Sequence, residues 1–127
     1  MMSVSRSIPE HLVVPPRVVE AANPAFTVEA EYIFRPDFPG FDGHFPANPL
    51  LPGIAQIMAV VQTVCHDRAG LLHEVKRCKF TRPVRPLERL KIVATVTEQA
   101  TTRHCRATLF AEGEAASTIS LTVAMQE

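Results

Sequence analysis

Hydrophobic and polar residues alternate along much of the second half of the chain and along one stretch of the first half. In residues 26–34, FTVEAEYIF, every second residue is apolar: Phe26, Val28, Ala30, Tyr32 and Phe34. Residues 89–99 alternate in the same way, and residues 102–113 and 114–125 follow as two further segments joined by a Glu112–Gly113 turn. A period of two is typical of β-strands with one buried face. The last three segments, separated by short turns, predict an antiparallel meander.

One segment has a different pattern and predicts a buried helix. Residues 53–70, GIAQIMAVVQTVCHDRAG, follow Pro52 and end at Gly70, which suit the start and the end of a helix. Apolar residues lie on nearly every side of this segment, as in a helix that is covered all round. We therefore expect a central helix over residues 53–69. Together with the strands it predicts an α+β protein whose antiparallel sheet curls around the helix.

The remaining elements are less regular. Residues 17–22, RVVEAA, are a short strand candidate before a turn at Asn23–Pro24, and residues 74–84 contain another strand. Residues 1–15 predict an irregular lead-in, because prolines interrupt this part of the chain at Pro9, Pro15 and Pro16. With 127 residues and no internal repeat, the sequence is expected to form a single domain over residues 1–127.

Composition narrows the classes of function. The chain is 46% hydrophobic and 20% charged, with 13 basic and 13 acidic residues and a net charge of +0. A neutral chain lacks the positive field on which general nucleic-acid and anionic-membrane binders depend, so neither partner is expected. The most apolar stretch is broken by polar residues and is too short to span a bilayer. The first ten residues lack an apolar secretory core, which favours a cytoplasmic protein.

The cysteines indicate neither a disulfide framework nor a metal site. Cys65, Cys78 and Cys105 are odd in number and widely spaced, which fits reduced thiols in a reducing compartment. Cys65–His66 and His104–Cys105 are adjacent pairs, but no CxxC or HxxxH spacing supports metal ligation.

The segment between the strand at 26–34 and the predicted helix is long, irregular and unusual in composition. Residues 43–53, GHFPANPLLPG, hold three prolines, two glycines and one histidine. A structureless connection of this length inside a small domain is uncommon and usually functional. Alone, His44 has two interpretations: a polar residue within a turn, or a group that moves protons near neutral pH.

Two motifs carry a resemblance to a known family. GHFPANPLLPG followed by a buried helix resembles the signature of the 3-hydroxyacyl-(acyl carrier protein) dehydratases, which have the hotdog fold. KFTRPVRPLERL, residues 79–90, is similar to a strand and turn of the same family. The resemblance covers roughly residues 17–125. The loop and the Gln56–Ile57 pair also resemble dehydratase-like proteins of aryl-polyene-type gene clusters.

The resemblance implies roles for individual residues. His44 matches the histidine that removes the α-proton of the acyl thioester, and Gly53 matches the glycine whose amide binds the thioester carbonyl. The other candidate substrate-binding residues are Phe45, Pro52, Met58 and Gln62. The resemblance further implies a homodimer or higher oligomer with its site assembled across two subunits, no cofactor, and a substrate carried on acyl carrier protein or coenzyme A.

The sequence departs from the family pattern at two positions. Met58 stands where the family has the Asp or Glu that protonates the departing hydroxyl, and a thioether cannot donate a proton. Leu87 replaces a glycine in the turn that precedes Glu88, which we expect to alter a surface turn rather than the chemistry. On a helix Cys65 would lie about 10 Å beyond Met58, too far to replace the acid.

Three functions are therefore open. The first is a dehydratase or isomerase-type enzyme that uses His44 with a relocated acid, or with His44 itself returning the proton. The second is a non-catalytic acyl-thioester-binding subunit, partnered by an active paralogue. The third, a hotdog thioesterase, lacks a carboxylate at the expected helix position. A basic stretch over residues 76–91, with seven Lys and Arg against Glu88, is a candidate docking surface for an acidic carrier protein or for a phosphopantetheine phosphate.

Overall fold

The computed structural model of the protein describes residues 7–41 and 49–126. Six strands form one antiparallel sheet in the order β1-β2-β4-β5-β6-β3. The elements in chain order are η1 (Ile8–His11), β1 (Leu12–Ala22), β2 (Ala25–Ile33), η2 (Pro39–Phe41), α2 (Gly53–Val64), β3 (Gly70–Phe80), β4 (Arg89–Gln99), β5 (Thr102–Ala111) and β6 (Glu114–Met125). The predicted meander is confirmed, because β4, β5 and β6 are neighbours in the sheet.

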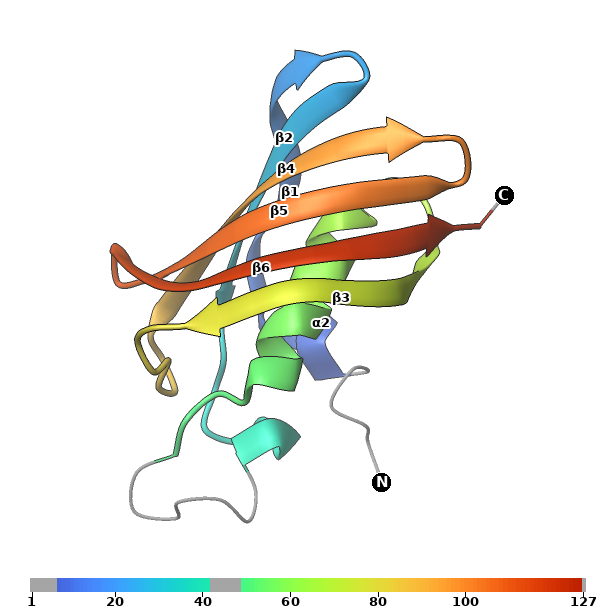
Figure 1. Cartoon of the computed structure of the whole chain (residues 1–127). Coiled ribbons are helices and arrows are strands. Elements are labelled where there is room, and N and C mark those ends of the chain that lie inside the picture. The colour runs from blue at the N-terminus through green and yellow to red at the C-terminus, as the bar shows by residue number, and fades with distance from the viewer. Residues whose placement is uncertain (1–6, 42–48, 127) are drawn as a thin grey trace.

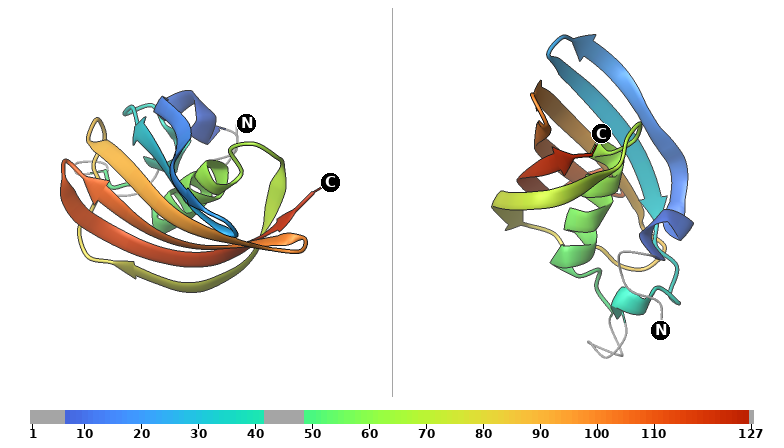
Figure 2. Two further views of the ribbon diagram at one scale, coloured as in Figure 1. Left: turned by 90° about the horizontal axis from the view of Figure 1, so that it is seen from above. Right: turned by 90° about the vertical axis from the view of Figure 1, so that its right-hand side faces the viewer.

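The sheet curls around α2, as Figure 1 and the left view of Figure 2 show. The alternating residues of the strands explain this arrangement, because one face of each central strand is buried and the other is not. Ala55 and Ala59 of α2 are fully buried, and the Tyr32 hydroxyl of β2 donates to the Ala59 carbonyl at 3.4 Å. The predicted α+β class, with one buried helix wrapped by a curved antiparallel sheet, is confirmed.

The first strand begins at Leu12, so the predicted irregular lead-in over residues 1–15 is wrong from that residue on. Pro15 and Pro16 lie inside β1, which is an edge strand with β2 as its neighbour in the sheet. The register between β1 and β2 is irregular between Val14 and Arg17, where the two prolines stand. An edge strand tolerates proline because an amide on its outer side has no ladder partner to lose.

Helix α2 ends at Val64, five residues before the predicted end. The guanidinium of Arg103 on β5 donates to the Val64 carbonyl and to Asp67 Oδ1, each at 2.8 Å, and lies 5.3 Å from the Phe26 ring centroid. A cation at this point satisfies a free carbonyl at the helix C-terminus and complements the helix dipole. Within the described residues no helix is both long and apolar enough to cross a membrane.

Candidate functional site

The start of α2 lines a small cavity. Pro52 precedes the helix in an extended conformation, and its carbonyl accepts the amides of Ala55 and Gln56 at 3.1 and 3.2 Å. The Gly53 amide has no hydrogen-bond partner among the residues that the structure describes. A free N–H at the positive end of a helix is a donor suited to an oxygen that gains negative charge.

The cavity lies between the helix start and the end of β3. Its volume is about 290 Å³, and its wall includes Leu51, Gly53, Gln56, Phe80, Thr81 and Arg82. The Leu51 amide donates to the Val84 carbonyl at 2.7 Å, which ties the segment before the helix to the segment after β3. A Cβ atom on Gly53 would lie 2.8 Å from the Phe80 ring. Phe80 would have to shift to accept a side chain at position 53, so glycine suits this close approach, which the sequence did not predict.

The predicted site residues fall into three groups. Pro52 and Gly53 lie at the helix start, and Gly53 lines the cavity. Met58 and Gln62 are partly exposed on α2 and do not belong to the cavity wall as the structure describes it. His44 and Phe45 lie outside the described residues, so their roles remain predictions from the sequence.

Gln56 is a cavity residue to which the sequence analysis assigned no role. Its side chain is only 3% exposed, and its Oε1 accepts the Ser117 hydroxyl of β6 at 2.8 Å. Its Nε2 donates to the Leu51 carbonyl at 3.4 Å. A glutamine inside a mostly apolar helix was the available sequence signal, but its partners lie 61 residues away in β6 and 5 residues back in the chain.

No acid or histidine belongs to the cavity wall among the described residues. Glu88, which contacts the wall residue Arg82, is already paired. It forms two hydrogen bonds with the Arg82 guanidinium, at 3.1 and 2.9 Å, and accepts a hydrogen bond from the Arg85 amide at 2.7 Å. The hydrogen bond from Arg82 lowers the pKa of Glu88 below its usual value, so this carboxyl is ionised at neutral pH. The structure thus supplies no substitute for the missing acid within the described part of the cavity.

The turn that precedes β4 has a left-handed residue where the family pattern has glycine. Leu87 has a φ of 69°, a left-handed conformation that glycine adopts without cost. The Glu88 carboxylate holds the turn through the Arg85 amide. Leu87 is exposed and is not a wall residue of the cavity, so the departure lies in a surface turn, as the sequence interpretation expected.

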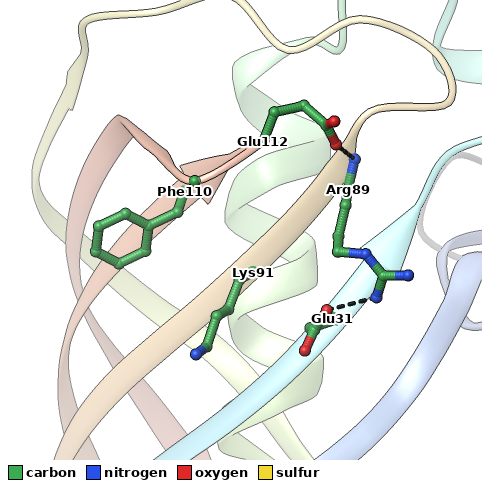
Figure 3. A pocket seen from close by; sticks show the side chains of 6 residues that line it. Glu31, Arg89, Lys91, Phe110 and Glu112 are labelled. Carbon is green, nitrogen blue, oxygen red and sulfur yellow. Dashed lines mark hydrogen bonds and ion pairs between the residues drawn. The ribbon is translucent and has the colours of Figure 1, made fainter.

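Another depression lies elsewhere on the molecule and is electrostatically balanced. It has a volume of about 540 Å³ and lies on the outer face of the sheet, with α2 behind it (Figure 3). Arg89 Nη1 meets Glu31 at 2.6 Å, and the Arg89 amide donates to Glu112 at 2.6 Å. Because its charges neutralise each other, this depression offers little to a charged ligand. Among the described residues, no group of three or more His, Cys, Asp or Glu side chains is arranged to hold a metal.

One helix wrapped by a six-stranded antiparallel sheet defines the hotdog fold, and similar solved structures share it. A protein from Erwinia carotovora subsp. atroseptica, whose function is uncharacterised, aligns over 91% of this chain and 95% of its own with a TM-score of 0.71 and 22% identity. The dehydratase heterocomplex ApeI:P from Xenorhabdus doucetiae aligns over 87% of this chain and 99% of that chain, with a TM-score of 0.57 and 25% identity.

Sequence comparison defines the family within this fold. The family described as ApeI-like, ApeI dehydratase, matches residues 20–119. The chain belongs to this ApeI-like dehydratase family. The 3-hydroxyacyl-(acyl-carrier-protein) dehydratase FabZ of Rickettsia felis is 29% identical over 100 residues, 70% of this chain and 69% of that protein. For several other FabZ relatives the matched part spans only about half of their length, 44% and 47% in two of them.

Proposed function

We propose that the protein acts in the dehydration of a 3-hydroxyacyl thioester, with the thioester carbonyl held by the Gly53 amide. The observation that carries the proposal is Gly53 at the start of α2, a residue that lines the cavity and whose amide has no partner among the described residues. In the reaction a proton leaves C2 and a C2–C3 double bond forms as the C3–O bond breaks. The hydroxyl takes up a proton and departs as water, leaving a trans-2-enoyl thioester.

His44 is proposed as the base that accepts the C2 proton. The carbonyl gains negative charge as that proton leaves, and a fixed N–H donor at this point stabilises the charge. Met58 supplies no proton for the hydroxyl, so His44 itself passes on the proton it has taken, or a second subunit supplies an acid. A thioesterase is less well supported, because no described wall residue of the cavity offers a carboxylate to activate water.

A second subunit is supported by an exposed edge of the molecule. β3 is an edge strand, and Leu71, Val75 and Phe80 on it are 63%, 37% and 45% exposed. Ile54 of α2 is 56% exposed. An apolar surface beside an unpaired strand edge is typical of a surface covered in an oligomer. We propose that this surface binds a second hotdog subunit, either a copy of this chain or a paralogue.

The alternative function is that of a non-catalytic, acyl-thioester-binding subunit in a heteromeric dehydratase. Met58 in the position of the family acid favours it. So does the similarity to a dehydratase heterocomplex from Xenorhabdus doucetiae. In that case the active paralogue would contribute the acid.

A hydration assay with a crotonyl thioester separates the two functions. We expect the purified protein to hydrate the substrate slowly and Met58→Glu to raise kcat at least about tenfold, since a placed general acid contributes about 10²–10⁴-fold. Met58→Gln, of similar size but without an acid, is the matched control and should not gain activity. Inert wild type together with an active Met58→Glu variant would overturn catalysis by the native chain and favour the binding subunit. Light scattering of the same samples measures the oligomeric state of each variant, which is then compared with its activity.

In the folded protein the cations of residues 76–91 fall into two groups, and only one of them is a candidate to bind a carrier protein. Arg82, Arg89 and Lys91 are paired with Glu88, Glu31 and Glu29 at 2.9, 2.6 and 3.4 Å. Arg77 and Lys79 of β3 instead line an outer groove of about 400 Å³ with Arg106 of β5. Arg77 and Arg106 are both register partners of Ser120 on β6, so these two cations lie at the same level on either side of β6.

The three cations of this groove make no ion pair with any residue that the structure describes. We propose that it docks an acidic carrier protein. The double variant Arg77→Glu/Arg106→Glu should lower kcat/KM at least about tenfold for a carrier-protein thioester, because like charges oppose encounter. The rate with a free pantetheine thioester should stay unchanged. Arg68→Glu, an exposed cation outside the groove, is the control; equal losses with both substrates would count against docking.

A further inference from the structure

Gln56 is buried on the wall of the same cavity as the free Gly53 amide. The two residues are three positions apart on α2, so they lie on neighbouring turns of one helix face. Both line the cavity of about 290 Å³. A glutamine that is only 3% exposed must satisfy its amide internally, so its hydrogen bonds define where its donors point.

The partners of Gln56 determine the orientation of its amide group. Ser117 donates its hydroxyl to Oε1 at 2.8 Å, and the Leu51 carbonyl accepts from Nε2 at 3.4 Å. The reversed orientation would set Oε1 against the Leu51 carbonyl, which places two acceptors together. Nε2 therefore lies on the Leu51 side, beside the helix start.

One N–H of Gln56 has no acceptor among the residues that the structure describes. Nε2 carries two hydrogens, and the structure gives it one acceptor, Leu51, at the long distance of 3.4 Å. No second acceptor for Nε2 occurs among the residues that the structure describes. A spare donor in a buried wall is available to a ligand that enters the cavity.

We propose that Gln56 Nε2 is a second hydrogen-bond donor to the thioester carbonyl, beside the Gly53 amide. This inference rests on the proposed function, which sets the carbonyl at the helix start. Two fixed donors stabilise the charge that develops on the carbonyl oxygen better than one, and side-chain amides serve as such donors in other enzymes. Ser117 is then a positioning residue, because it holds Oε1 and so directs Nε2.

The first test is kinetic and uses Gln56→Leu, which removes the donor and keeps a similar volume. We expect kcat for crotonyl thioester hydration to fall about 10²–10³-fold with little change in KM, as for the loss of one donor to a developing oxyanion. Ser117→Ala should lower kcat less, because the amide remains but loses its orientation. Gln99→Leu, the same chemical change on the protein surface, is the control. Thermal unfolding verifies that each variant is folded, and Gln56→Met replaces Gln56→Leu if the latter is not.

The second test does not require turnover. A crotonyl pantetheine thioester labelled with ¹³C at its carbonyl is bound to the protein, and its carbonyl stretching frequency is measured by infrared spectroscopy. A hydrogen bond lowers this frequency, so the band should move upward in Gln56→Leu. A folded Gln56→Leu variant with wild-type kcat and an unchanged band would overturn the inference. The wild-type protein could be inert while the carbonyl band of the bound thioester still shifts in Gln56→Leu. That result would contradict the proposed catalysis but support Gln56 as a donor to the carbonyl.

Discussion

Replacing His44 by alanine should lower the rate of crotonyl thioester hydration about 10²–10⁴-fold, the usual contribution of a general base. An imidazole is the one group of the GHFPANPLLPG segment that accepts a proton near neutral pH. Since Met58 cannot take part in proton transfer, His44 would perform both proton steps or share them with a second subunit. The loss on His44→Ala is therefore expected to exceed that of any other single substitution in the chain.

The control for this experiment is another histidine replaced in the same way. His104 lies on the outer face of the sheet, hydrogen-bonded to the Thr122 hydroxyl at 3.1 Å, and His104→Ala should retain near wild-type activity. A His44→Ala variant within threefold of wild type would exclude His44 as the base. Binding of the pantetheine thioester is measured in parallel, because a binding subunit would lose affinity rather than turnover.

Replacing Arg103 by methionine should destabilise the fold by about 2–4 kcal/mol, because a buried, multiply bonded cation is removed. The Arg103 side chain is 4% exposed, and it joins the end of α2 to β5 through Val64 and Asp67. Methionine keeps apolar contact with Phe26 but leaves the Val64 carbonyl without its donor. The free energy of unfolding in urea measures the effect.

Arg106→Met is the matched control, because Arg106 lies on the same strand in the outer groove without an ion pair in the described structure. Its expected change is within about 0.5 kcal/mol, as for most surface substitutions. Equal changes in unfolding free energy for the two variants would show that the contacts of Arg103 with Val64 and Asp67 add no more stability than a surface arginine does.

The stability that the ion pair between Asp67 and Arg103 contributes should depend on pH. The hydrogen bond from Arg103 lowers the pKa of Asp67 below its usual value of 3.8. The stabilisation is therefore fully present above pH 3.8 and is lost as the pH falls through the lower, folded-state pKa. The difference in unfolding free energy between wild type and Arg103→Met should shrink over that acidic range.

Local patterns predicted most of the fold because burial on a single face leaves a period in the sequence. Residues 89–99 match β4 from end to end, and residues 114–125 match β6. The pattern failed where sheet position decides the outcome. Pro15 and Pro16 indicate an irregular segment by themselves, but an edge strand with an irregular register accommodates them. The predicted helix continued past Val64, where the guanidinium of Arg103 binds its last turn.

By itself the amino-acid sequence determined the strand pattern, the buried helix, the family motif with His44, and the absence of an acid at position 58. These features are local, since alternation, composition and spacing are properties of neighbouring residues. Only the tertiary structure decided which cations of residues 76–91 are neutralised, and which groups share the cavity with Gly53. Ser117 is hydrogen-bonded to Gln56, 61 positions away in the sequence, and Arg89 is hydrogen-bonded to Glu31, 58 positions away. Contacts between such distant residues form only when the sheet curls around the helix, and no local pattern records them.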